Sequence, residues 1–459
     1  MPKDSSSLPE EKHDHGPLKF PKDFLWGTST SAHQVEGNNT NSDWWKWEQT
    51  REPKLRSGKA ADEYNLYEED FDLAKDLGLN AQRISIEWAR IQPLEGVFDT
   101  NAIEHYIKVL KALKKRNFTV MLTLWHFTLP QWVADQGGFE NSKITELFNK
   151  FVEKIVPEIK AYVDLWITLN EPTVYAYMAY NQGLWPPQKK SNLRAFEVIW
   201  NLAQAHKKSY ETLHKLIPGA RVGIAHNIHS FESYHKHSIT ELLAVGFGDF
   251  FTNHLFYTLT KAHHDFLGIN YYFHHRIERI DKFIPQLVEV DEQVADTSDL
   301  GWELYPEGLF EVLADFADHI DIYVTECGIA STNDDRRTRF LINYLSEVYR
   351  ATKDKIPVKG FFYWSLIDNF EWHQGVDPRF GLIEIDYKTQ ERTIRPSAYV
   401  YSEIIKNNGI PHSLLRLLGH TVRVEEVLCY MHKDEPKALC EHLTSSRYPR
   451  HSKEISIKK

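Results

Sequence analysis

Cysteine is scarce in this sequence of 459 residues. Its three cysteines, Cys327, Cys429 and Cys440, cannot all pair with one another, and they lack the spacing of metal ligands. We therefore expect neither a disulfide-stabilised scaffold nor a structural zinc module. A reducing, cytoplasmic location is the prediction that follows from this cysteine usage.

Excess positive charge and long apolar runs are also missing. The formal net charge is -10, and no basic stripe is visible, whereas nucleic acids and anionic membranes both attract basic surfaces. No apolar run approaches the ~20 residues that span a bilayer, and residues 1–19 lack an apolar signal core. The sequence thus predicts no nucleic-acid partner and no membrane partner.

Aromatic residues, in contrast, are plentiful. They make up 13% of the chain, with 13 Trp, 22 Tyr and 25 Phe, which would suit a cleft that stacks on sugar rings. Taken singly, most of them are explained by core packing. With 42% hydrophobic residues, the chain can form two or three average domains or one large barrel.

Strand-like and helix-like runs alternate along the chain. Eight apolar, β-rich runs recur, each separated from the next by a helical pattern: "FLW", "AQRISI", "FTVMLTLW", "DLWITL", "RVGIAHN", "HDFLGINYY", "HIDIYVTE" and "KGFFYWSL". Continuous apolar strands covered by helices indicate a parallel sheet that is buried on both faces. We therefore predict a single-domain (β/α)₈ TIM barrel with elaborated βα loops. A doubly wound sheet is the alternative, but no G-x-G-x-x-G turn follows the first strand.

The predicted barrel covers residues 20–409. Residues 1–19 are charged and rich in Ser and Pro, so we expect a disordered tail. Residues 410–459 lack the strand-helix repeat and are predicted to be an appendage of unassigned role, with short elements over Val422–Met431 and Glu435–Leu443.

Two of the predicted strands end on a glutamate. The run Leu165–Leu169 stops at Asn170 and Glu171, and Pro172 blocks strand pairing beyond them. The run Ile322–Val324 leads through a threonine to Glu326. A single glutamate at such a position is often only a loop acid or a helix cap. Two at the carboxyl ends of barrel strands can face each other, and two carboxyl groups ~5 Å apart are the equipment of a retaining glycosidase.

Several motifs, taken together, carry a resemblance to a known family. They are "FLWGTSTSAHQVEG", "RISIEWARI", "HFTLPQW", "TLNEP", "LGINYY", "LGWELYPEGL", "VTECG" and "WSLIDNFEW". Nearly all of the chain between its two termini resembles the family 1 glycoside hydrolases, which include β-glucosidases and β-galactosidases. The resemblance implies a retaining β-glycosidase without cofactor or metal. It would hydrolyse terminal non-reducing β-D-glucosyl residues of a small glycoside or oligosaccharide, with tolerance for β-D-fucosyl and β-D-galactosyl residues.

The resemblance also implies roles for individual residues. Glu171 would be the general acid/base and Glu326 the nucleophile. Arg83, Asn270 and Tyr272 would position the nucleophile, and a cation and a hydroxyl donor beside Glu326 would lower its pKa. The residues expected to bind the sugar are Gln34, His126, Asn170, Glu371 and Trp372, with Trp364 as a stacking floor and Trp302 as a wall on the leaving-group side. Considered alone, His126 would be better explained as a core histidine with satisfied hydrogen bonds, and core packing would be equally favoured for Trp364.

Three departures from the family pattern stand out. Cys327 follows the nucleophile where Asn is usual, which affects the expected local hydrogen bonding. Phe127 follows His126 where Trp is common. The segment between Asn227 and Asn270 is shorter than the family norm, so we expect the helix and loop there to be thin or mobile.

The same residues narrow the substrate and the competing functions. A carboxylate at Glu371 would repel the phosphate of a 6-phosphorylated sugar, and Glu171 is the acid that thioglucoside-cleaving members lack. A non-catalytic sugar-binding protein is disfavoured because both glutamates are present. A metal-dependent barrel hydrolase would place a His-x-His pair after its first strand, where this chain has "GTSTSAHQVEG". Oligomeric state and aglycone preference are not specified by these patterns.

Overall fold

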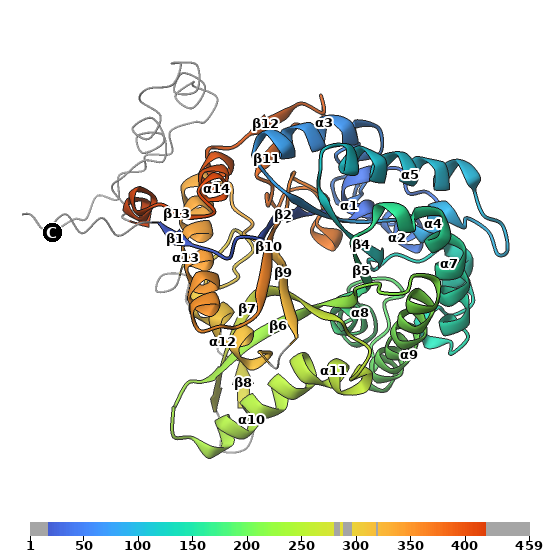
Figure 1. The fold of residues 1–459 in the computed structure, drawn as a ribbon. Coiled ribbons are helices and arrows are strands. Elements are labelled where there is room, and N and C mark those ends of the chain that lie inside the picture. Colours follow the sequence, from blue (N-terminus) through green and yellow to red (C-terminus); the bar gives the residue numbers. More distant parts are fainter. Residues whose placement is uncertain (1–16, 280–284, 288–295, 318–319, 419–459) are drawn as a thin grey trace, which may run out of the picture.

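The computed structural model describes residues 17–279, 285–287, 296–317 and 320–418. Eight parallel strands form a closed barrel, because the sheet order β6-β5-β4-β3-β2-β10-β9-β7 is completed by pairing of β6 with β7. Helices surround the barrel (Figure 1). The predicted (β/α)₈ architecture is confirmed.

Most barrel strands are buried at all or all but one of their residues, as their continuous apolar patterns predict. In chain order they are β2 (Leu25–Ser29), β3 (Ala81–Ser85), β4 (Thr119–Trp125), β5 (Leu165–Asn170), β6 (Val222–Ser233), β7 (Phe266–Arg279), β9 (Asp321–Cys327) and β10 (Val358–Trp364). β6 and β7 are the longest, and they stay paired well beyond the rim, as far as Ser233 and Ile277. The two strands thus form a ribbon that rises above the carboxyl-end face of the barrel.

Helices alternate with these strands, as the sequence pattern predicts. They are α3 (Glu63–Asp76), α5 (Thr100–Lys115), α7 (Ile144–Ile159), α9 (Asn192–Leu216), α10 (Ile239–Asp249), η5 (Phe250–His254), α11 (Leu255–Thr260), α12 (Pro306–Asp315), α13 (Asp334–Lys353) and α14 (Pro396–Lys406). Side-chain caps fix several starts: Asp99 caps α5, Ser191 caps α9 and Asn333 caps α13.

Short elements elaborate the loops that follow the strands. They are α1 (Ala32–Glu36), α2 (Asp43–Glu48), η1 (Pro53–Leu55), α4 (Trp88–Ile91), α6 (Gln131–Asp135), η2 (Gly138–Glu140), η3 (Lys160–Tyr162, before β5), α8 (Pro172–Ala176), η4 (Tyr177–Asn181), η6 (Trp372–Gln374), and the hairpin of β11 (Ile383–Ile385) with β12 (Arg392–Ile394). β8 (Pro285–Leu287) pairs antiparallel with β7. Most of the residues that a minimal barrel would not need therefore lie on the carboxyl-end side of the barrel, where active sites form in this architecture.

The two ends of the described chain meet. β1 (Leu18–Lys19) pairs antiparallel with β13 (Gly409–Ile410), and η7 (His412–Leu418) continues past the predicted boundary at 409, with Leu414 and Leu417 buried. The predicted tail, apart from residues 17–19, and the predicted elements at 422–431 and 435–443 lie outside the described residues.

The barrel interior has its own apolar cluster, separate from the main core between barrel and helices. It comprises Ala81, Met121, Leu165, Ile167, Ala225, Phe266, Tyr323 and Phe362. Two strand glycines make room for the large rings: a Cβ on Gly27 would lie 2.5 Å from the Phe362 ring, and one on Gly223 would lie 2.9 Å from the Phe266 ring. This packed floor leaves the carboxyl-end mouth as the place for a site.

The segment between Asn227 and Asn270 differs from the expectation. Residues 239–260 are helical through α10, η5 and α11, so the prediction of a thin helix there is wrong. Asn253 ties this run to β6, because its side chain accepts from the His229 backbone N–H at 2.9 Å and donates to the His229 carbonyl at 2.8 Å. Within the described part of the chain, no helix is long and apolar enough to cross a membrane.

Candidate active site

Glu171 and Glu326 stand at the carboxyl ends of the fourth and seventh barrel strands. Glu171 directly follows β5 and precedes α8, with a left-handed φ of 42° that turns the chain out of the sheet. Glu326 is the penultimate residue of β9. Both are almost fully buried, with exposed fractions of 7% and 4%. The structure thus places both predicted carboxyl groups at one rim of one barrel.

A chain of hydrogen bonds connects the two carboxyl groups. Asn270, on β7 between them, donates to Glu171 Oε1 at 2.7 Å and to Asn170 Oδ1 at 3.3 Å. Asn170 Oδ1 also accepts from Arg83 at 2.6 Å, and Arg83 in turn bonds Glu326 Oε1 at 2.5 Å. Thr325 fixes the Asn270 amide by donating to its Oδ1 at 2.7 Å. Carboxyl groups linked through so few side chains are near neighbours across the mouth.

The two glutamates differ in their other partners. Glu326 is bonded by the Arg83 guanidinium at 2.5 Å and by the Tyr272 hydroxyl at 2.9 Å. Glu171 receives, besides Asn270, the side-chain amide of Asn227 at 2.9 Å. A direct cation favours the ionised form of Glu326, whereas Glu171 has only neutral donors in hydrogen-bond contact.

Burial dominates the titration of both groups. Desolvation, together with the charge of Glu326, raises the pKa of Glu171 to about 7. Desolvation also raises the pKa of Glu326, although Arg83 and the hydrogen bonds oppose it. Arg83 and Tyr272 thus lower the pKa of Glu326 as expected, but removal from water outweighs them, so the net shift is upward and not downward.

Gln34 and Glu371 lie together at the mouth. Gln34 Nε2 donates to the Phe370 carbonyl at 2.8 Å, to Asn369 Oδ1 at 3.1 Å and, at 3.4 Å, to Glu371 Oε2. Its Oε1 is buried without a protein partner. Burial and the charges of Glu326 and Glu171 raise the pKa of Glu371 to about 8. An orphaned amide oxygen beside a carboxyl group suits adjacent sugar hydroxyls.

His126 and Asn170 form a second polar pair. His126 Nε2 lies 3.1 Å from Asn170 Nδ2, and Asn170 Oδ1 accepts from Arg83 at 2.6 Å. Burial lowers the pKa of His126 well below its usual value, so the imidazole is neutral. Because Arg83 donates to the amide oxygen of Asn170, the amide nitrogen of Asn170 faces Nε2 of His126 and donates to it. The imidazole proton of His126 therefore lies on Nδ1, which has no protein partner. His126 therefore has a free donor rather than the satisfied hydrogen bonds of a core histidine.

Three tryptophans surround these polar groups. Trp364 ends β10 and packs with Ala330 and Phe380, next to Tyr272 and Trp302. Trp302 lies 5.8 Å from the Tyr272 ring, measured between ring centroids. Trp372 stacks on His33 at 5.8 Å and 4° and contacts Trp44 at 4.7 Å. The structure thus brings all twelve predicted site residues to the same mouth.

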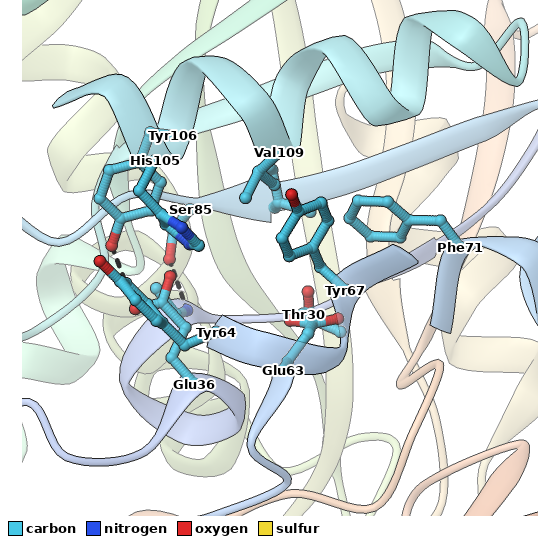
Figure 2. A pocket seen from close by; sticks show the side chains of 12 residues that line it. Thr30, Glu36, Glu63, Tyr64, Tyr67, Phe71, Ser85, His105, Tyr106 and Val109 are labelled. Atoms are coloured by element: carbon cyan, nitrogen blue, oxygen red, sulfur yellow. Dashed lines mark hydrogen bonds between the residues drawn. The ribbon is translucent and has the colours of Figure 1, made fainter. Parts of the chain in front are cut away.

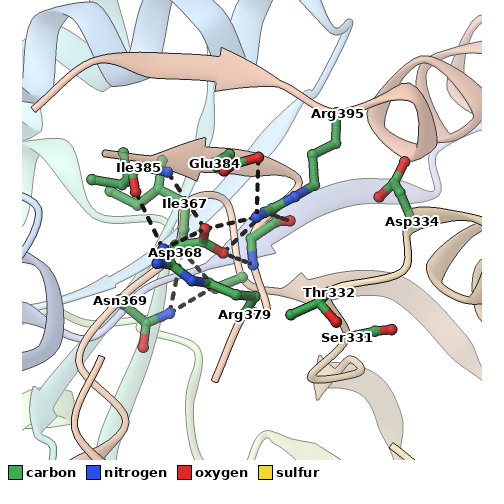
Figure 3. A network of polar contacts seen from close by, with 12 residues as sticks. Ser331, Thr332, Asp334, Ile367, Asp368, Asn369, Arg379, Glu384, Ile385 and Arg395 are labelled. Atoms are coloured by element: carbon green, nitrogen blue, oxygen red, sulfur yellow. Dashed lines mark hydrogen bonds and ion pairs between the residues drawn. The ribbon is translucent and has the colours of Figure 1, made fainter. Parts of the chain in front are cut away.

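A buried ion-pair network holds the segment that carries Glu371 and Trp372. Asp368 accepts from Arg395 at 2.8 and 2.9 Å, from Arg379 at 3.2 Å and from the backbone N–H of Gly381 at 2.9 Å (Figure 3). Asp368 itself is fully buried. This anchor fixes the chain three residues before Glu371.

The departures from the family pattern have structural explanations. Cys327 is fully buried in the main core, and successive strand residues point to opposite faces, so its thiol does not face Glu326. Phe127 has a left-handed φ of 72° and fills space between Trp185, at 4.9 Å, and Trp372, at 5.2 Å. Neither residue removes a donor from the two carboxyl groups.

Asn227 was missed by the sequence reasoning. It follows the apolar start of β6, donates to Glu171, and has a buried Oδ1 without a partner. The signal was the same one that Asn170 and Asn270 gave, namely an amide just after an apolar strand run.

A small cavity behind α1 does not belong to this site. It is lined by acidic and aromatic side chains of α1, α3 and α5, among them Glu36, Glu63, Tyr64, His105 and Tyr106 (Figure 2). Burial raises the pKa of Glu36 to about 7 despite its bond to Arg90. None of the predicted site residues lines it, so the space for a sugar is the barrel mouth.

Comparisons with known proteins agree with this geometry. The model of the family described as glycosyl hydrolase family 1 matches residues 17–260 and 249–410. A 1,4-beta-D-glucan glucohydrolase of Thermotoga neapolitana is 31% identical over 443 residues, covering 85% of this chain and 99% of the relative. A beta-galactosidase of Sulfolobus acidocaldarius is 30% identical over 484 residues, covering 87% and 98%. The solved beta-glycosidase from Pyrococcus horikoshii superimposes with a TM-score of 0.83 at 38% identity, covering 88% and 99%.

Proposed function

The chain belongs to glycosyl hydrolase family 1 and is a retaining β-glycosidase, and from this premise we propose that it hydrolyses terminal non-reducing β-D-glucosyl residues. β-D-Fucosyl and β-D-galactosyl residues are proposed as additional substrates, since the similar proteins include both a glucan glucohydrolase and a beta-galactosidase. The observation that carries the proposal is a pair of carboxyl groups linked through Asn270, Asn170 and Arg83, of which one is paired with Arg83 and the other has no cation in hydrogen-bond contact.

Glu326 is proposed as the nucleophile. Arg83 and Tyr272 hold its carboxylate on both oxygens, which orients it and favours its ionised form. It attacks the anomeric carbon and forms a glycosyl ester while the aglycone leaves. Glu171, with its pKa of about 7, gives its proton to the leaving oxygen and afterwards takes a proton from the water that hydrolyses the ester.

The sugar is proposed to bind between the polar pairs. Gln34 Oε1 and the Glu371 carboxyl accept from hydroxyl groups, and His126 Nδ1 donates to one. Trp364 stacks on the C–H face of the ring, Trp372 contributes its indole edge, and Trp302 borders the leaving-group side.

Electrostatics of the mouth exclude phosphorylated sugars. The mouth holds the buried carboxyl groups of Glu171 and Glu326 and the partly buried one of Glu371, whereas Arg83 is hydrogen-bonded to Glu326 alone among them. A phosphate placed beside Glu371 would add negative charge to a site that already has too little positive charge. Unphosphorylated glycosides are thus the proposed substrates.

Paired variants test the assignment. We expect Glu171→Ala and Glu326→Ala each to lower kcat on an aryl β-glucoside by several orders of magnitude. Azide should restore turnover of Glu171→Ala with a β-glucosyl azide as product, because azide attacks the glycosyl ester without a base. Full activity in either variant, or β-glucosyl azide formed by Glu326→Ala, contradicts the assignment.

A metal-dependent mechanism is the competing function. Within the described ranges, the cluster of side chains spaced for a metal ion is Asp249, His254 and Asp315, at the ends of α10, η5 and α12 rather than at a strand end. The proposed mechanism predicts turnover that a chelator does not change, and loss of activity on chelation would contradict it.

The cytoplasmic location is also a proposal. It is supported by Cys327, a buried, unpaired thiol whose pKa burial raises well above its usual value. Fractionation of the source cells tests it, and recovery outside the cytoplasm would contradict it.

A further inference from the structure

A stripe of large apolar side chains faces outward on the helical run of α10 and η5. Its members recur every three or four residues and are 42–74% exposed: Ile239, Leu242, Leu243, Phe247, Phe250 and Phe251. We call these six residues the docking stripe. Ring contacts join its end, with Phe247 and Phe251 centred 4.4 Å apart. An amphipathic helix normally turns such a stripe inward.

The inward side of α10 carries a buried acid beside small residues instead. Glu241 is the buried residue of this helix, and His235 bonds its carboxylate through its backbone N–H at 2.8 Å and its imidazole at 2.9 Å. Gly248 allows close contact with the ribbon, since a Cβ there would lie 3.2 Å from the Phe231 ring. The helix is therefore anchored by polar and close contacts, and the described residues leave its apolar side uncovered.

The stripe lies on the same side of the barrel as the active site. α10 follows β6 and packs on the part of β6 and β7 that rises above the rim, at the edge of the molecule in Figure 1. The other large apolar side chains that the described residues leave exposed also lie in segments that follow strand carboxyl ends: Leu94, Val97, Tyr177, Leu184, Leu193, Phe196, Trp200 and Tyr234.

Aromatic side chains connect the stripe to the leaving-group side of the site. Phe231, behind Gly248, lies 6.0 Å from the His229 ring, and His229 lies 4.9 Å from Phe273. Phe273 in turn lies 4.7 Å from Trp302. Phe231, Phe273 and Trp302 are all partly exposed, so they offer an apolar path from the stripe toward Trp302.

We propose that the docking stripe rests on the surface of an uncharged lipid bilayer, and that the enzyme acts on β-glycosides whose long apolar aglycone is held in that bilayer. The second half rests on the proposed function. Tyr234, Lys236 and His237 stand exposed at the amino-terminal end of the stripe, the aromatic and basic composition that residues at a lipid–water boundary have. The net charge of -10 disfavours binding to anionic lipid, and apolar side chains can bind a bilayer without anionic lipid.

A second copy of the chain fits the stripe less well. At ~200 Å² of surface per large side chain, six side chains that are 42–74% exposed offer less than the ~800 Å² per partner of a stable interface. A bilayer has no such minimum, because lipid tails adapt to a narrow stripe.

Vesicle partitioning tests the proposal. Phosphatidylcholine vesicles are mixed with the full chain, and bound protein is measured by flotation for wild type, for Leu243→Ser/Phe247→Ser and for the matched control Leu94→Ser/Val97→Ser. We expect wild type and control to float with the vesicles, and the stripe variant to partition about 10-fold or more weakly, since two exposed apolar side chains are lost. Circular dichroism and thermal unfolding check that all three are folded.

Substrate turnover separates this proposal from the proposed function. With a long-chain alkyl β-glucoside in the vesicles, the stripe variant should lose about 10-fold in rate relative to wild type, while its turnover of a soluble aryl β-glucoside stays unchanged. Absence of aryl glucoside turnover in wild type would refute the proposed function, whatever the flotation result. Wild type that does not float, equal flotation of all three proteins, or a wild-type dimer that the stripe variant converts to a monomer would overturn the docking proposal.

Discussion

The decisive residues of this protein are carboxylic acids kept out of water. Glu171 and Glu326 have similar burial, yet Arg83 bonds only Glu326, whereas Glu171 accepts from the amides of Asn270 and Asn227. The division of labour between acid and nucleophile therefore depends on one guanidinium. Glu371 adds a third carboxyl group with a pKa of about 8, so this group is largely protonated near neutral pH.

Activity should fall on the alkaline side. The proton that Glu171 donates is lost as pH rises through its pKa of about 7, so kcat/KM for an unactivated β-glucoside should decline above that pH. Steady-state rates over a pH series measure this. A dinitrophenyl β-glucoside is the control, since its leaving group needs no proton. The glycosylation rate with this control substrate should not decline above about pH 7. Identical alkaline limbs for both substrates would contradict the role of Glu171.

Stability should also depend on Glu171. A carboxyl group whose pKa is raised from 4.5 to about 7 on folding stabilises the fold fully only below about pH 4.5, and this contribution is lost as pH rises to about 7. Glu171→Gln removes this titration. The melting temperature of the variant relative to wild type should therefore be higher at about pH 8 than at about pH 5, by an amount that corresponds to a few kcal/mol. An equal difference at both pH values would contradict the raised pKa.

At the scale of elements, the alternation of apolar runs predicted the barrel well because burial on both faces leaves a strong pattern. The run Leu165–Leu169 and the amide and acid after it predicted β5 and its chemistry, and Ile322–Val324 did the same for β9. The family resemblance supplied Gln34 and Glu371, which lie in loops without periodicity. Asn227 carried the same strand-end signal as Asn170 but was overlooked.

Other features could not be read from local sequence. The direction of the Glu326 pKa shift depends on the balance between burial and Arg83, and burial is a property of the assembled mouth. The helix at 239–260 was expected to be thin because its segment is short, but length does not show that Asn253 ties it to β6. Its outward apolar stripe likewise depends on which side Glu241 anchors.

The loop after β10 should depend on Asp368. Asp368→Asn removes the charge that Arg395 and Arg379 share inside the protein, and breaking a buried pair of this kind costs about 3–5 kcal/mol. Denaturant unfolding measures the cost, and KM for an aryl β-glucoside should rise because Glu371 and Trp372 follow this anchor. Glu384→Gln is the matched control, since that exposed carboxylate lies 3.7 Å from the same Arg395 and should cost less than about 1 kcal/mol. Equal costs for both variants would contradict the anchor.

At the scale of the whole molecule, the described fold closes on itself. The barrel has no open edge, and β1 pairs with β13 so that the first and last described segments meet. Buried Leu414 and Leu417 of η7 complete the packing against α13. The core and the site are thus both contained in residues 17–418.

Truncation tests whether residues 17–418 suffice for the core and the site. A chain that ends after Gly419 keeps every described core and site residue, so its free energy of unfolding should change by less than about 0.5 kcal/mol and its kcat on a soluble aryl β-glucoside should stay the same. A chain that ends before η7, after Ile410, is the comparison and should be less stable. Loss of activity in the longer truncation would show that residues 420–459 belong to the catalytic unit.

The central claim is that Glu326 becomes covalently attached to the sugar while Glu171 serves as acid and base. Incubation with a 2-deoxy-2-fluoro-β-glucoside that has a good leaving group slows release of the intermediate, and peptide mass spectrometry then locates the label. We predict one fluoroglucosyl group per chain, attached to Glu326, in wild type and none in Glu326→Ala. A label on another residue, or complete turnover with inversion and no label, would contradict the account.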